Sequence, residues 1–421
     1  MASATVQNSI GSQIEYTRNE LPVLFMLASR LWKRIGVRTD VKPVSNRPAR
    51  IPFLATAGAK FRSANFDGQD MNLGSGPQET NGNLSCASFL QCSEYTALAE
   101  WSTASDEQAI KNYVTLTQTQ AAKTFAGYMD ATFQGDGSNT LDTVVSTATQ
   151  GLVVNNANLF QDNQDLDCYS ALTGAAGFIA TVTIDTVDIA NNIIWLTAAV
   201  PAGVTTGTKL LVAGSAGIAN SGLAGLRAYQ VSGNSGSYMG IQRSAFPGKF
   251  STPSINVGGS LTPAIVRALE AQIELAIGLD EADAVDLVAH ANVDMRAAWE
   301  NVGLLVTSNI YQQIKGDQSE DMLKKRAPTM IAGRELLVNE RAVPGLIDFL
   351  ALKNWFRIET KPLDYYEVGG QTIFPGYGIS GGLSSNVLFY LVNMCQTGLS
   401  TPRAGGYLSN VTIPSKYFGQ N

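Results

Sequence analysis

Residues 129–145 read MDATFQGDGSNTLDTVV, and they mark the point where a long helical pattern gives way to β-strand patterning. Two glycines flank an aspartate here, an arrangement that phosphate loops and calcium loops also use. A phosphate loop places its glycines before a helix N-terminus, whereas these glycines follow a helix. A calcium loop needs alternating oxygen ligands and a terminal glutamate, which this stretch lacks. The stretch is therefore predicted to end a helix and turn the chain.

The helix that ends here is predicted to begin at Ser105. The sequence SDEQ fits a capping box, because Gln108 follows the Ser105 N-cap by three residues. Gly135 is expected to supply the left-handed stop. At 1.5 Å per residue the helix would be roughly 45 Å long, which is unusual for an ordinary domain. Its apolar stripe consists of Ile110, Val114, Ala121, Phe125, Met129 and Phe133.

Upstream of this helix the pattern indicates an extended arm. RIPFLAT (50–56) and LSCASFLQCSEYTALAEW (84–101) read as two strands, and a Gly-, Asn- and Asp-rich stretch separates them. That stretch is too long for a tight hairpin turn and too polar for a core. We expect a two-stranded arm, with residues 57–83 projecting from the subunit. Before it, residues 21–37 read as a short basic amphipathic helix that stops near Gly36.

Downstream of the turn, stretches with β-strand patterning alternate with stretches of helical periodicity. Residues 177–243 contain β-branched runs separated by turn signals, which predicts a small all-β module, a compact barrel or sandwich. Helical periodicity returns after Thr262, the predicted cap, and Gly278 is the predicted stop. The fold class is therefore predicted as α+β with a β insertion.

The composition points to a chain whose surface meets other protein. Only 15% of the 421 residues are charged, against about a quarter in an ordinary soluble domain. So few charges cannot cover the surface, as is typical of an obligate assembly. No apolar run is long enough to span a bilayer, and the four cysteines lack the spacing of a zinc site or disulfide framework. The product is expected in the cytosol where it is made.

The charges form two opposed blocks. Residues 1–62 hold ten Lys/Arg and three acidic residues, a net charge of +7, and residues 63–110 hold seven acidic residues and no Lys or Arg. One interpretation is two solvated faces; the other is that one block docks on the other, within or between subunits. The contact hypothesis involves Arg30, Lys33, Arg34, Arg38, Lys60 and Arg62 on the basic side, and Asp67, Asp70, Glu94, Glu100, Asp106 and Glu107 on the acidic side.

The sequence offers no catalytic constellation. GISGG (378–382) has the spacing of a nucleophile elbow around Ser380, but the only histidine, His290, precedes it, whereas that fold needs the base to follow. DNQDLD (162–167) is a weak candidate for a cation, since most such runs are solvated loops. A net charge of −6 argues against a nucleic-acid-binding module. No catalytic, cofactor-binding or metal-ligating residue is predicted.

Taken in order, these elements resemble the major capsid proteins of tailed bacteriophages, the HK97-type capsid fold. The residues that carry the resemblance are the basic N-terminal region, the arm, the long helix ending in FQGDGSNTL, the stretch MGIQRSAFPGKFSTPSI (239–255), and IAGRELLVNERAVPGLIDFLALKNW (331–355). The resemblance covers most of residues 20–413 as an order of elements. Some relatives place a cross-linking lysine in the loop that holds Lys60, but no partner is identified here, so an ordinary surface lysine is expected.

The resemblance implies a division of the chain and a role. Its parts are an N-terminal arm (1–48), an extended loop (49–101), a spine helix and start of a peripheral domain (102–140), the start of an apical domain (141–176), the inserted β domain (177–243), an apical domain (244–354), and peripheral and apical strands with the C-terminus (355–421). The implied role is a self-assembling icosahedral shell of pentamers and hexamers around packaged double-stranded DNA, in the virion. Partners would be other copies, a separate scaffolding protein, a portal and decoration proteins, with no membrane and no sequence-specific DNA contact.

Two alternatives remain open at this point. One is the shell protein of a cellular nanocompartment that encloses enzymes, which resembles the same fold. The other is an oligomeric β-rich virion surface or tail protein, which explains the β insertion but not the long capped helix or the arm.

Overall fold

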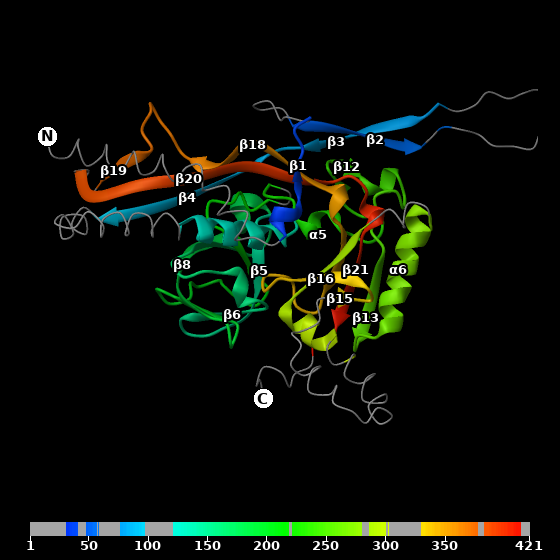
Figure 1. Cartoon of the computed structure of the whole chain (residues 1–421). Coiled ribbons are helices and arrows are strands. Elements are labelled where there is room, and N and C mark those ends of the chain that lie inside the picture. The colour runs from blue at the N-terminus through cyan, green and yellow to red at the C-terminus, as the bar shows by residue number, and fades with distance from the viewer. Residues whose placement is uncertain are drawn as a thin grey trace, which may run out of the picture.

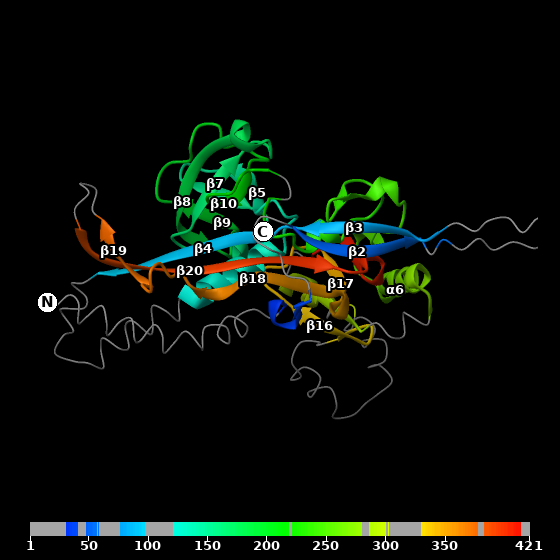
Figure 2. The same cartoon turned by 90° about the horizontal axis from the view of Figure 1, so that it is seen from above.

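The structure is a computed structural model. It describes residues 31–40, 48–56, 58, 76–96, 121–218, 221–279, 286–299, 302, 330–377 and 383–413. A long β ribbon runs along one side of the molecule, and two bodies lie beneath it, a barrel at one end and a second sheet with a helix at the other (Figure 1). The view from above shows the ribbon crossing the whole length of the molecule (Figure 2). The described residues are rich in strands with a few helices, which confirms the α+β class in its coarse form.

The ribbon is built on one long central strand, β20 (Leu383–Leu399). β4 (Ala87–Thr96) pairs antiparallel with one edge of β20, and β18 (Trp355–Tyr365) and β19 (Ile373–Tyr377) follow each other along the opposite edge. The two-residue strand β1 (Gly36–Val37) pairs parallel with β18. Alternate residues of a strand face opposite sides. One face of β20 is therefore buried in the core, at Phe389, Leu391 and Cys395.

The second body is a six-stranded mixed sheet, which we call the central sheet. Helix α6 (Pro263–Ile277) packs on it through Val266, Leu269 and Ile273. The Thr262 side chain accepts a hydrogen bond from the Ile265 N–H, and Gly278 ends the helix with a φ of 92°, so both predicted ends are confirmed. The strand order is β13 (Ser254–Gly259), β21 (Gly406–Val411), β17 (Ile347–Ala351), β14 (Leu287–Ala291), β16 (Arg334–Val338) and β15 (Met330–Ile331).

The first body is a closed barrel of six strands, all paired antiparallel. The predicted barrel is therefore present, but its predicted bounds, 177–243, are wrong. The barrel begins at Thr140, and residues 213–243 lie outside it. Residues 141–176, expected in the apical domain, supply part of its wall. Its strands are β5 (Thr140–Thr147), β6 (Gly151–Val154), β7 (Asp165–Tyr169), β8 (Phe178–Asp188), β9 (Ile193–Leu196) and β10 (Lys209–Val212).

The helix that leads into the barrel is described over residues 121–133. Phe125, Met129 and Phe133 are buried as the stripe predicts, whereas the expected start at Ser105 lies outside the described residues. The turn after the helix is structural: the Asp136 carboxylate accepts hydrogen bonds from the Ser138 N–H and hydroxyl. The left-handed residues are Gly137 and Asn139, at φ 93° and 63°, so the assignment of the stop to Gly135 is wrong.

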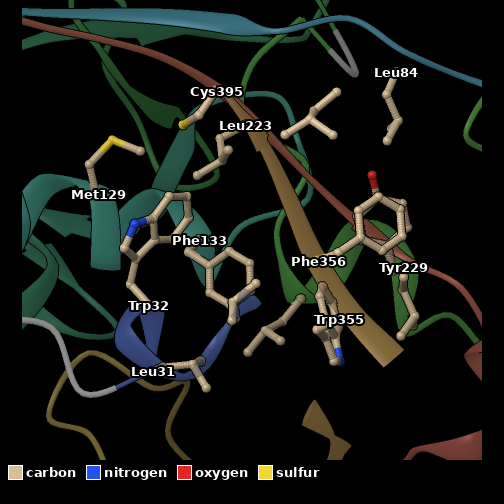
Figure 3. Close-up of a cluster of buried hydrophobic side chains, with 14 of the residues drawn as sticks. Leu31, Trp32, Leu84, Met129, Phe133, Leu223, Tyr229, Trp355, Phe356 and Cys395 are labelled. Atoms are coloured by element: carbon tan, nitrogen blue, oxygen red, sulfur yellow. The ribbon is translucent and has the colours of Figure 1, made fainter. Parts of the chain in front are cut away.

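The main hydrophobic core lies where the ribbon, this helix and the central sheet meet (Figure 3). Trp32, Phe133 and Trp355 come from three distant parts of the chain, and each is at most 3% exposed. The Phe133 ring lies edge-on to both tryptophans, with centroid distances of 5.9 Å to Trp32 and 5.6 Å to Trp355. This core joins elements from residue 31 to residue 399, so it fixes the ribbon on the rest of the molecule.

Candidate assembly surfaces

A two-stranded hairpin projects from the end of the molecule that carries α6 (Figures 1 and 2). It pairs β2 (Ala49–Thr56) antiparallel with β3 (Gln78–Leu84). The predicted arm is therefore present, but its second strand was misplaced. Residues 78–83 were expected in the polar loop, and together with Leu84 they form β3. Residues 87–96 of the predicted strand instead form β4 in the ribbon.

The two faces of the hairpin differ sharply. On β2, Ala49, Ile51 and Ala55 are buried against the body, whereas Pro52 and Leu54 are exposed, Leu54 at 64%. On β3, Gly82 and Leu84 are buried and the end at Gln78 and Glu79 is exposed. The inner face of β2 is therefore buried as far as Ala55, and Ala49, Ile51 and Leu84 at the base of the hairpin belong to the main core. The outer face at Pro52 and Leu54 and the end of β3 at Gln78 and Glu79 are exposed.

The base of the hairpin rests on an aromatic seat. The Phe53 ring lies edge-on to Tyr238, at 5.8 Å between centroids, and to Phe250, at 5.7 Å. Tyr238 and Phe250 stack on each other at 4.8 Å. Each such pair typically contributes about 0.5–1.5 kcal/mol beyond its buried area. The seat, defined as Phe53, Tyr238 and Phe250, therefore sets the direction in which the hairpin leaves the body.

Backbone contacts fix the hairpin to the same place. The Asn83 N–H donates to the Met239 carbonyl at 2.7 Å. Next to it, a Cβ built on Gly82 would lie 2.8 Å from Phe53 Cε2 and 3.1 Å from Met239 Cβ. Only glycine lets β3 approach this closely.

A buried arginine supports the seat from below. The Arg243 guanidinium is 1% exposed, donates to the carbonyls of Phe250, Ala228 and Tyr229, and lies over the Tyr238 ring at 5.4 Å. Burial lowers the pKa of Arg243 from its ordinary value. Because carbonyl oxygens satisfy its donors, the charge is accommodated without a carboxylate.

The seat is also tied to the end of the ribbon. The Tyr229 hydroxyl donates to the Thr397 carbonyl at 2.6 Å, and the Tyr238 hydroxyl donates to the Leu399 carbonyl. Both carbonyls belong to β20. Residues 229–250 thus connect the hairpin to the ribbon and hold the two in a fixed relative position. Sequence reasoning missed this role, although the aromatic density of the Gly-rich stretch around Arg243 is an available signal.

The N-terminal segment crosses the junction of the two bodies. Residues Trp32–Arg34 form a short 3-10 helix, and Gly36–Val37 form β1, so the predicted helix over 21–37 is wrong in its described part. The Trp32 side chain is fully buried, the Arg357 guanidinium lies 5.2 Å from its ring centroid, and Arg357 donates to the Trp32 carbonyl. Burial lowers the pKa of Arg357. An aromatic residue therefore anchors the segment in the core.

The predicted contact residues fall in different places. Arg34 donates two hydrogen bonds to Glu335 on β16, and Arg38 pairs with Asp40 while lying over the Phe356 ring. Lys33 lies in the 3-10 helix. Glu94 is exposed on the outward face of β4, opposite Leu388. The structure does not bring Arg34 or Arg38 to Glu94. Outside the described residues lie Arg30, Lys60, Arg62, Asp67, Asp70, Glu100, Asp106 and Glu107.

A polar turn, residues 339–342, joins the barrel to the body. The Asn156 side chain of the barrel and the Asn292 side chain of the central sheet both donate to the Glu340 and Ala342 carbonyls. The Asn339 amide donates to Asp130 on the preceding helix at 2.8 Å, inside the protein. Three parts of the fold thus meet at this turn, which holds the barrel in a fixed place.

The weak cation candidate, residues 162–167, is accounted for by internal hydrogen bonds. Asp162 accepts from the Val187 N–H, Asp165 from the Thr183 hydroxyl, and Asp167 from the Thr181 hydroxyl and the Gly214 N–H. These carboxylates tie neighbouring strands and turns of the barrel together. Within the described ranges, no group of three His, Cys, Asp or Glu side chains is placed to hold a metal.

His290 is a core residue on β14. It is fully buried, its Nδ1 lies 3.6 Å from an Asp348 carboxylate oxygen, and Asp348 also contacts Arg227. Ser380 lies outside the described residues, so nothing connects the two as a catalytic pair. None of the helices in the described part of the chain is long and apolar enough to cross a membrane.

Comparisons with known proteins find similarity in structure only. The sequence matches no family model, and no curated protein is similar to it in sequence. The capsid asymmetric unit of cyanophage A-1(L) aligns with a TM-score of 0.47 at 11% identity, covering 88% of this chain and 90% of that chain. The capsid of a native GTA particle aligns with a TM-score of 0.43 at 11% identity, covering 91% and 90%.

A virus-like particle from Pyrococcus furiosus also aligns, with a TM-score of 0.39 at 8% identity, covering 94% of this chain and 99% of that chain. These three solved structures are a cyanophage capsid, the capsid of a GTA particle and a virus-like particle.

Proposed function

We propose that this chain is the major capsid protein of a tailed phage, which assembles into an icosahedral shell with the HK97-type arrangement. The observation that carries the proposal is the β2–β3 hairpin. The aromatic seat holds its base in place. Its outer face and its far end at Gln78 and Glu79 are exposed. An element built so firmly at one end and left uncovered at the other gains its remaining contacts from a neighbouring copy.

The proposed division of the fold follows from this role. The hairpin is the extended loop, the helix ending at residue 133 is the end of the spine, the ribbon around β20 is the peripheral region, and the central sheet with α6 is the apical domain. A hairpin that leaves one end of the subunit makes a heterologous contact, in which different surfaces of two copies meet. Such contacts close into rings when the rotation between copies allows it.

The direction of the hairpin then controls the curvature of the assembly. The seat is tied through Tyr229 and Tyr238 to β20, so each subunit presents its arm and its ribbon at one fixed angle. Weak contacts that repeat at every subunit add up in a closed shell. This explains how a chain with few surface charges and small individual contacts could form a stable particle.

The contents of the shell follow from the charge of the chain, and its partners follow from the proposed role. A net charge of −6 suits a wall against which double-stranded DNA lies without adhering. We propose that a separate scaffolding protein directs assembly, that a portal occupies one vertex, and that decoration proteins bind outside. The role is structural, without enzymatic activity, and its place is the virion after synthesis in the host cytoplasm.

Electron microscopy of the expressed full chain tests the proposal. Purified protein, concentrated with and without a crowding agent, should sediment as large particles and show angular shells or curved sheets of ring-shaped units in negative stain. A protein that gives only rods, small rings or monomers at every concentration would contradict it. Small empty shells that enclose a second host protein would instead identify a nanocompartment.

A further inference from the structure

The helix α6 presents an uncovered apolar face on the side away from its own core. Leu275 is 86% exposed and Leu279, just beyond the helix end, is 71% exposed, the two highest values among the large apolar residues that the structure describes. Ala264, Ala268 and Ala271 are exposed on the same side as Leu275. Residues spaced by four, three and four positions share one helix face. This face is the α6 stripe, defined as Ala264, Ala268, Ala271 and Leu275; Leu279 is exposed just beyond Gly278, which ends the helix.

The stripe is not needed to hold α6 on its own sheet. The opposite side of the helix already buries Val266, Leu269 and Ile273 almost completely. A helix at a free surface usually carries charged or polar residues there. The three alanines leave the backbone accessible to close approach, since small side chains allow short interaxial distances.

The position of the stripe indicates what covers it. Both views place α6 at the end of the molecule from which the β2–β3 hairpin projects, whereas the barrel lies toward the other end (Figures 1 and 2). A neighbour that receives the hairpin must lie beyond this end, and α6 faces it. We propose that the α6 stripe packs against that same neighbouring copy of this chain. This inference rests on the proposed function and adds a second, apolar contact to the one made by the arm.

The size of the stripe fits a contact that forms only within an assembly. A helix of 15 residues is about 22 Å long. One face of such a helix is smaller than the roughly 800 Å² per partner that a stable pair of proteins buries. The stripe alone therefore does not hold two subunits together, and isolated subunits stay soluble with it exposed. Once the hairpin has bound the neighbouring copy, it holds the α6 stripe close to that copy. The effective concentration for the stripe contact is then high, and the contact adds to the stability of the ring.

The experiment compares a substitution in the stripe with a matched control on the same helix. Leu275→Glu places a charge in the stripe at its large apolar residue, and Gln272→Glu adds the same charge at an exposed position beside it. Both variants should melt within about 2 °C of the parent as subunits, since neither side chain is in the core. Leu275→Glu should reduce the yield of large particles at least tenfold by sedimentation, and Gln272→Glu should reduce it less than twofold.

A cysteine probe measures burial directly and separates the outcomes. In a Cys92→Ser background, Leu275→Cys should react with a maleimide rapidly in subunits and at least tenfold more slowly in particles. Normal particles from Leu275→Glu, or equal reactivity in both states, would overturn the inference and leave the capsid proposal intact. An Ala271→Cys variant that forms disulfide dimers with itself would also overturn it, because the stripe would then pair with its own copy around a two-fold axis. A parent chain that forms no particles at all would refute the proposed function instead.

Discussion

Arg34 and Glu335, separated by 301 positions in sequence, form a two-point ion pair. The guanidinium of Arg34 donates to the two carboxylate oxygens of Glu335 at 2.6 and 2.5 Å. The pair links the N-terminal segment to β16, the second strand from one edge of the central sheet. The charge hypothesis assigned Arg34 to an acidic residue of another subunit. The structure gives it a partner within its own subunit, so its first expected effect is on the subunit itself.

Reversing one charge of this pair should weaken the subunit modestly. Arg34→Glu is expected to lower the free energy of unfolding by at most about 1 kcal/mol, because the side chains are 36% and 49% exposed and solvent screens them. The swapped double variant Arg34→Glu with Glu335→Arg should recover most of this loss. Urea unfolding of all three proteins measures it. A double variant no more stable than the worse single variant would show that the pair is not coupled.

The same pair predicts a pH dependence with a defined sign. The hydrogen bonds from Arg34 lower the pKa of Glu335 below its ordinary value of 4.5. A carboxyl whose pKa is lowered by folding adds stability above the unfolded-state pKa, and this contribution is lost as the pH falls through the folded-state value. The stability difference between the parent and Glu335→Gln should therefore be constant near neutral pH and shrink below about pH 4.5. A difference that grew on acidification would contradict the assignment.

Trp32 should contribute far more to the free energy of unfolding than the Arg34–Glu335 ion pair. Its side chain is fully buried between Phe133 and Arg357, in the core shown in Figure 3. Trp32→Ala is expected to cost about 3–5 kcal/mol of unfolding free energy, as large aromatic truncations in cores do. The control is Val37→Ala, five residues on and 44% exposed, which should cost under about 1 kcal/mol. Equal losses would mean that the segment is not anchored by its tryptophan.

The barrel should fold by itself when its bounds are taken from the structure. A fragment of residues 138–215 contains all six strands and every buried residue of their core except Ala131. It should show a β-type circular dichroism spectrum and melt cooperatively. The fragment 177–243 lacks β5, β6 and β7, so it cannot close the barrel and should not melt cooperatively.

Cys168 gives an independent measure of barrel closure. It is the single cysteine of the 138–215 fragment, is fully buried, and its pKa is raised to about 11 by burial. Because the thiolate is the reactive form, a thiol reagent at neutral pH should label Cys168 only after denaturant unfolds the fragment. Immediate labelling in buffer would show that the isolated barrel is open.

Elements with local signals were predictable from the sequence. Helix α6 has its cap at Thr262, its stop at Gly278 and a buried stripe in between, and each of these depends only on neighbours along the chain. The hairpin arm was predictable in kind, because RIPFLAT alternates and the following stretch cannot form a core. Its partner strand was not, because QETNGNL has little strand propensity and pairs only through contacts with β2 and Met239.

The missed half of the barrel has the same explanation. Asp165 and Asp167 make β7 look like a polar loop, yet both carboxylates accept hydrogen bonds from threonines on β8. The aromatic seat was hidden for a related reason, since Phe53 lies about 185 positions before Tyr238 and the contact exists only in three dimensions. Both features depend on long-range pairing, which a local pattern does not encode.

The seat of the hairpin leads to the most direct test of how the subunit controls assembly. Gly82→Ala places a methyl group 2.8 Å from Phe53 Cε2 and 3.1 Å from Met239 Cβ, so either the Phe53 ring must leave its place in the seat or β3 must shift relative to Met239. Overpacking of this kind typically costs about 1–3 kcal/mol. Because the strain falls at the base of the hairpin, the arm should leave at a changed angle, and particles should become irregular or fail to close while the subunit still folds. Negative-stain images and thermal melting of the same preparations measure the two effects.

Gly76→Ala is the matched control, since a methyl group there meets no atom within 4 Å. If Gly82→Ala closed into regular particles like those of Gly76→Ala, the seat would not set the direction of the arm.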